Sequence, residues 1–84
     1  MKHRYGISEE QFVEMYTYQN GSCAICEKSI TPKQSLVDHC HNTKFIRGLL
    51  CRKCNFAIGL LSDNKKYIEN AIQYLGNDYK LKIL

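Results

Sequence analysis

Hydrophobic residues recur at helical spacing near the start of the chain, where Phe12 and Tyr16 fall on one face. Ser8 and Gln11 lie just before this run and have the S-x-x-Q spacing of a capping box. An Asn-Gly pair follows the run and is a typical stop signal. The pattern predicts an N-terminal helix over residues 8–20.

The pattern then changes to that of extended chain. Residues 22–34 show no regular period, and they contain two cysteines and the only proline. Residues 35–41 and 45–50 are short runs typical of strands, and a polar Asn-Thr-Lys turn lies between them. These runs predict an antiparallel hairpin.

Two further helical patterns follow the hairpin. The first runs from Cys54 to about residue 62 and tolerates Gly59, and an Asp-Asn pair ends it. The second, residues 65–76, is amphipathic and is expected to close the domain. The predicted order is an N-terminal helix (8–20), a segment (21–62) that contains two zinc knuckles (short turns that each carry a pair of cysteines), the hairpin and a helix, and a closing helix. This order predicts an α+β fold.

The length of 84 residues allows one domain, residues 1–84, and a small core. Domains of this size often need a disulfide or metal staple. No apolar run reaches the roughly 18 residues of a membrane span, and no apolar segment follows the basic N-terminus as in a signal peptide. We therefore expect a cytoplasmic protein without a membrane partner, in which the five cysteines serve better as metal ligands than as disulfides.

Four of the cysteines form two pairs, Cys23-x2-Cys26 and Cys51-x2-Cys54. Two such pairs complete a tetrahedral sulfur shell, which suits zinc, and a closed shell makes that zinc structural. The alternatives are free core thiols or a redox pair. The fifth, Cys40, is expected to be a buried strand thiol, with a ligand or redox role as its alternative.

A second group of polar residues lies on the predicted hairpin and the helix after it. Asp38 and Asn55 offer hard oxygen ligands that suit Mg²⁺, and the neighbouring imidazole of His39 could take a proton from an attacking water. Strand alternation would send Asp38 and His39 to opposite faces, so both can serve one site only if the strand ends or kinks there. The alternatives are solvated side chains and an Asn55 that only caps a helix.

At these residues the sequence resembles the phage recombination endonuclease VII family, which belongs to the HNH, or ββα-metal, nucleases. The resemblance covers about residues 8–76, because both knuckles and the Asp-His-x-His motif between them fall in register. The segments that carry it are Gly21–Cys26, Val37–His41, Ile46–Cys51, Cys54–Asn55, Ala57–Gly59 and Tyr74–Leu75.

The resemblance implies a zinc-stabilised ββα-metal domain with flanking helices that hydrolyses phosphodiester bonds of DNA, by nicking or double-strand cleavage, with branched DNA among the substrates. It implies that Asp38 and Asn55 hold a catalytic Mg²⁺ or Mn²⁺ and that His39 is the general base. His41 matches a second active-site histidine. Family members that resolve branched DNA carry a longer C-terminal region that forms a dimer. Because 84 residues hold little of it, we expect simple cleavage, and a homodimer has no support from the short C-terminus.

Positive charge is concentrated around this group. Residues 28–66 contain eight basic and two acidic residues, within a chain of formal net charge +4. Such a segment favours a phosphate backbone as partner. The expected phosphate contacts are Arg47, Arg52, Lys53 and Lys44. The rival function is a non-catalytic zinc module that binds DNA or a protein, and a structural or assembly factor is a third.

Overall fold

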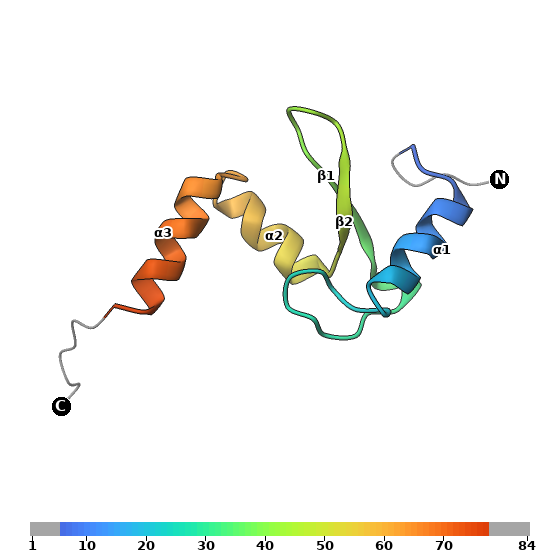
Figure 1. The fold of residues 1–84 in the computed structure, drawn as a ribbon, viewed down its shortest axis with the longest axis horizontal. Helices are drawn as coiled ribbons and strands as arrows, with labels where there is room; N and C mark the ends of the chain where they lie inside the picture. The colour runs from blue at the N-terminus through green and yellow to red at the C-terminus, as the bar shows by residue number, and fades with distance from the viewer. Residues whose placement is uncertain (1–5, 78–84) are drawn as a thin grey trace.

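The computed structural model describes residues 6–77, and its elements follow the predicted order (Figure 1). They are α1 (Glu9–Tyr18), a short 3-10 helix η1 (Pro32–Gln34), β1 (Leu36–His39), β2 (Ile46–Leu50), α2 (Arg52–Leu60) and α3 (Lys65–Leu75). This is a small α+β fold with one two-stranded sheet. No helix in the described part of the chain is long and apolar enough to cross a membrane.

Helix α1 begins with the predicted capping box. The Ser8 hydroxyl accepts a hydrogen bond from the Gln11 N–H at 3.1 Å, and the Gln11 side chain accepts one from the Ser8 N–H at 2.8 Å. The helix ends at Tyr18, earlier than predicted, because Asn20 and Gly21 both have positive φ angles (57° and 64°) that lead the chain out of the helix.

The hairpin is antiparallel, as predicted, but its first strand is shorter. β1 ends at His39, and the chain then turns, with the Cys40 N–H donating to the Phe45 carbonyl at 2.8 Å. Asp38 lies opposite Gly48 and His39 lies opposite Ile46, which leaves Arg47 as an extra residue on β2. This β-bulge interrupts the alternation of side chains at the Asp38–His39 step.

The core lies on both sides of the hairpin in two clusters. Ile7, Phe12, Val37 and Leu49 form the cluster against α1. Cys23, Ile30, Leu50 and Cys54 form the cluster between the knuckles and α2. Consecutive residues of β2 therefore face different clusters, and the hairpin connects α1 to the cysteines.

Gln19, just after α1, holds the outer edge of β2. Its side-chain amide donates to the Leu49 carbonyl at 3.0 Å and accepts from the Leu49 N–H at 2.9 Å, as a neighbouring strand would. Gly48 makes room for this contact, since a Cβ there would lie 3.0 Å from the Gln19 Oε1 atom. Leu49 is fully buried, so these bonds satisfy backbone groups that no solvent reaches.

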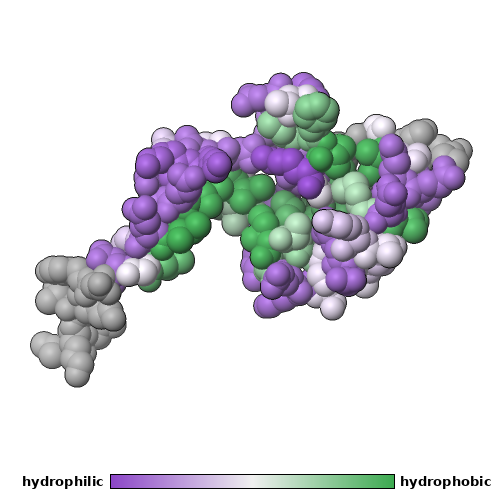
Figure 2. Space-filling view, in the orientation of Figure 1, coloured by the Kyte–Doolittle hydropathy of each residue, from purple (hydrophilic) through white to green (hydrophobic). Residues whose placement is uncertain are grey.

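Helices α2 and α3 differ in how they pack. α2 begins at Arg52, two residues before the predicted start, because Cys51 caps it, and it lies against both strands. α3 forms as predicted but buries none of its residues; its apolar stripe stays exposed in Figure 2, with Leu75 83% accessible. Positive φ angles at Ser62 and Asp63 turn the chain so that α3 points away from the hairpin (Figure 1), and the closing role expected of α3 stays a prediction.

Candidate functional site

The two cysteine pairs meet in one cluster between the knuckle and the start of α2. The sulfur atoms of Cys23, Cys26, Cys51 and Cys54 all lie within 4.8 Å of one another, and those of Cys26 and Cys51 are 3.9 Å apart. A tetrahedral zinc with Zn–S bonds of about 2.3 Å requires sulfur atoms about 3.8 Å apart. The four thiols therefore fit a zinc ion with little movement.

Backbone N–H groups support this cluster. The Ile25 N–H donates to the Cys23 sulfur and the Cys54 N–H donates to the Cys51 sulfur, each at 3.4 Å. The knuckle that presents them is closed by Glu27, whose φ of 66° lets its N–H reach the Cys23 carbonyl at 3.0 Å. Hydrogen bonds of this kind stabilise thiolates, the form that binds metal.

The protonation of the metal-free cluster is uneven. Burial opposes ionisation of Cys23, but hydrogen bonds from the backbone of Cys51, Cys26 and Ile25 outweigh it and lower the pKa of Cys23 to about 6. Burial and hydrogen bonds with the neighbouring thiols raise the pKa of Cys54 to about 12. A metal ion must therefore displace at least one proton from the cluster at neutral pH.

The fifth cysteine is outside the cluster, as predicted, but it is not a buried strand thiol. Cys40 follows the end of β1 and is only partly buried. Hydrogen bonding with Thr43 in the turn lowers the pKa of this thiol. The prediction was wrong because the strand ends at His39, two residues before its predicted end, so Cys40 lies in the turn.

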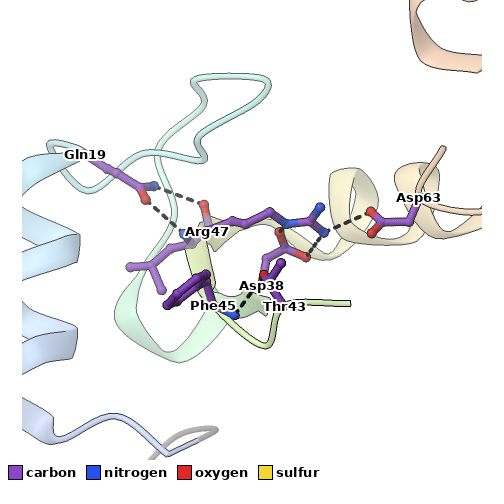
Figure 3. Close-up of polar contacts among 7 residues, drawn as sticks. Gln19, Asp38, Thr43, Phe45, Arg47 and Asp63 are labelled. Atoms are coloured by element: carbon purple, nitrogen blue, oxygen red, sulfur yellow. Dashed lines mark hydrogen bonds and ion pairs between the residues drawn. The ribbon is translucent and has the colours of Figure 1, made fainter. Parts of the chain in front are cut away.

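A salt-bridge network lies at the β-bulge (Figure 3). Arg47 donates from Nε to Asp38 Oδ2 at 2.7 Å and from Nη2 to Asp38 Oδ1 at 3.1 Å. The same Nη2 atom donates to Asp63 Oδ1 at 2.9 Å. These bonds raise the pKa of Arg47, and the bond from Arg47 lowers the pKa of Asp63.

Asp63 is the residue of this network that the sequence pattern did not single out. It was interpreted only as part of a helix break, yet its left-handed backbone (φ 53°) brings its carboxylate to Arg47. The available signal was charge, because Asp38 and Asp63 are the only acidic residues between positions 28 and 66. The network joins β1, β2 and the turn between α2 and α3.

The histidines lie next to this network. The His39 and His41 rings are 5.1 Å apart between centroids and tilted by 59°. Both imidazoles also contribute, through their charge, to the lowered pKa of Asp63. The bulge thus gathers two imidazoles and two carboxylates at one end of the hairpin.

Asn55 lies on the first turn of α2 and is partly buried. Within residues 6–77 its side chain shares no hydrogen bond with Asp38, whose carboxylate is taken by Arg47. A hollow of about 240 Å³ lies between the hairpin and α2 and is lined by Asp38, Arg47, Ile58 and four other residues. A common cation for Asp38 and Asn55 stays a prediction.

The predicted phosphate contacts occupy two places. Lys44 lies in the hairpin turn, with φ 69°, and Arg47 lies in the bulge. Arg52 and Lys53 form the exposed first turn of α2, next to the cysteine cluster. None of these placements tests a DNA contact, and the four assignments stay predictions.

Fold and cysteine cluster together define a class: a small α+β domain with four close cysteines that could hold a structural metal such as zinc. The sequence model of the recombination endonuclease VII family matches residues 1–77. The chain belongs to that family, which confirms the resemblance drawn from its motifs.

Two curated relatives come from mycobacteriophages. The chain is 37% identical over 82 residues to the Gene 59 protein of Mycobacterium phage L5, a match that covers 95% of the chain and 50% of that protein. It is 40% identical over 73 residues to the Gene 59 protein of Mycobacterium phage D29, covering 84% and 44%. The chain thus spans about half the length of the curated relatives it matches.

Proposed function

We propose that this protein is a metal-dependent DNA endonuclease of the HNH, or ββα-metal, type. The observation that carries the proposal is the β-bulge between Asp38 and His39, in a hairpin that leads directly into α2. The bulge breaks the strict alternation that would separate the two side chains. It supports a single site built from the end of the hairpin and the first turn of α2.

Asp38 and Asn55 would hold a divalent cation in this site, because carboxylate and amide oxygens are the ligands that Mg²⁺ and Mn²⁺ prefer. Such an ion would stabilise the negative charge that develops on the phosphate and on the leaving 3′ oxygen. Asp38 would have to exchange its bonds with Arg47 for the cation. Asp63 then keeps Arg47 beside the site, where its guanidinium can contact a phosphate.

His39 acts as the general base. It removes a proton from the water whose oxygen attacks phosphorus while the bond to the 3′ oxygen breaks. His41, whose ring lies 5.1 Å from that of His39, is the residue we assign to a contact with the phosphate or the leaving group. The products are a 5′-phosphate and a 3′-hydroxyl end, and the host cytoplasm is the expected place of action.

A plasmid assay tests the proposal. Wild-type protein with zinc bound should nick or linearise supercoiled DNA with Mg²⁺ or Mn²⁺, and His39→Ala should lower the rate by about 10²-fold or more. Asn42→Ala, an exposed change in the adjacent turn, is the matched control and should cut like the wild type. Zinc content and circular dichroism verify that all three proteins are folded.

The assay also separates the rival function. A folded, zinc-loaded wild-type protein that shifts DNA in a gel but cuts neither plasmid nor branched DNA with either cation would favour the non-catalytic zinc module. Equal cutting by wild type and His39→Ala would overturn the assignment of the base.

A further inference from the structure

A second concave surface lies beside the cysteine cluster, away from the Asp38–Arg47 network. It is a groove of about 520 Å³ between the knuckle, η1 and the start of α2. Its basic residues are Lys28, Lys33, Arg52 and Lys53, and its remaining walls are Cys26, Ser29, Ile30, Gln34, Leu36 and Cys51. No acidic residue among positions 6–77 lines it.

The charge of this groove is uncompensated. Within residues 6–77 the salt bridges are those of Arg47 with Asp38 and Asp63, so none of the four groove cations is paired with a carboxylate. All four side chains are exposed. A cleft lined by charge of one sign focuses the field and attracts a polyanion.

A metal in the cluster does not cancel this charge. One zinc ion and four thiolates carry two net negative charges, against four positive charges in the groove. The N–H groups that bond to Cys23 and Cys51 also disperse the thiolate charge. The groove therefore stays net positive when zinc is bound.

The groove also lies near the proposed catalytic end of the hairpin. Leu36 lines the groove and lies three residues before His39 on β1. At about 3.3 Å per strand residue, the two positions are about 10 Å apart.

We propose that the groove formed by Lys28, Lys33, Arg52 and Lys53 binds the DNA backbone beside the phosphate that is cut. The inference rests on the proposed endonuclease function and extends it, because it assigns a binding surface separate from the catalytic residues. Contacts of this kind give affinity and position without base recognition.

Salt-dependent binding tests the proposal. Fluorescence anisotropy of a labelled duplex of about 20 base pairs is measured without Mg²⁺ or chelator, for wild type, for Lys33→Ala/Lys53→Ala, and for Lys65→Ala/Lys66→Ala. The last variant loses the same charge from the start of α3, outside the groove. Each phosphate contact contributes about −0.9 to the slope of log K against log salt.

We expect the groove variant to have a slope shallower by about 1.8, so that wild type loses about twelvefold more affinity than this variant between about 50 and about 200 mM KCl. The α3 variant should keep the wild-type slope. An unchanged slope in the groove variant, or an equal change in both variants, would overturn the proposal.

Two further readouts separate other roles of these cations. If they instead balance the charge of the zinc cluster, the groove variant will lose zinc or melting temperature while its salt slope is unchanged, which overturns the proposal. If the groove takes an acidic peptide, the variant will lose affinity for polyglutamate and not for DNA. Binding is scored without catalysis, so a protein that binds through the groove but never cuts would contradict the endonuclease proposal alone.

Discussion

Replacing Cys51 by serine tests its role as a metal ligand separately from its role as the N-cap of α2. The Cys51 sulfur belongs to the four-sulfur cluster and also accepts the Cys54 N–H at the start of α2. Serine is a good N-cap, so the cap of α2 should survive the change, but its hydroxyl is a poor zinc ligand. The variant therefore reports on metal binding.

The expected loss of stability is large. A structural zinc contributes on the order of 10 kcal/mol to folding, whereas a whole domain is stable by about 5–15 kcal/mol. Two of the eight buried hydrophobic residues in the described part of the chain, Cys23 and Cys54, are themselves members of the four-sulfur cluster. Cys23 and Cys54 are half of the core cluster between the knuckles and α2, and without the metal they are no longer linked by a common ion. We therefore expect Cys51→Ser to be largely unfolded at 25 °C.

Thermal melting by circular dichroism, together with zinc content by mass spectrometry, measures the effect. Cys40→Ser is the matched control, because it exchanges the same atoms at a partly buried site outside the cluster, where changes usually stay within about 0.5 kcal/mol. A Cys51→Ser protein that melts cooperatively without zinc, within a few degrees of the control, would refute the reasoning.

Two more predictions concern the edge of β2 and the pH dependence of metal binding. Gln19→Ala leaves the buried N–H of Leu49 without a partner, whereas the Leu49 carbonyl keeps its bond from the Ala24 N–H. The change should lower the free energy of unfolding by about 1–3 kcal/mol in urea at saturating zinc. Gln11→Ala removes only an exposed capping bond and should cost about 1 kcal/mol or less, and equal costs would contradict the role of Gln19. Because the pKa of Cys54 is raised to about 12, the metal-free cluster holds at least this proton at neutral pH, so the apparent zinc affinity should fall at least tenfold for each unit of pH lowered. The decline in zinc affinity should steepen near pH 6, where Cys23 also takes up a proton. Competition with a chelator at several pH values measures the zinc affinity. An affinity independent of pH would contradict this assignment of protons.

Local signals in the sequence were enough to predict much of the fold. The Ser8–Gln11 capping box, the hairpin turn and the spacing of the two cysteine pairs each depend on residues close together in the chain, and each was confirmed. The α+β order followed from these signals.

The remaining features depend on contacts between distant segments. Gln19 binds Leu49 thirty residues away, and Arg47 binds Asp63 sixteen residues away. The β-bulge that leaves Arg47 unpaired on β2 has no marker in the local pattern. Sequence periodicity describes one element at a time, so it could name Asp38 and His39 as candidates but not the bulge between them or the partnership with Asp63.

Cys51 lies between β2 and α2, caps α2 and belongs to the cysteine cluster, and Asn55 follows only one helical turn later. Removal of zinc would therefore release the helix that carries a proposed ligand of the catalytic cation. A chelator such as EDTA would then inactivate the proposed nuclease in two ways, by removing the zinc that stabilises the fold and the cation proposed for the reaction. The order of metal re-addition separates these effects: activity that returns with Mg²⁺ alone means that the zinc stayed in place, whereas activity that needs zinc first means that α2 had come loose.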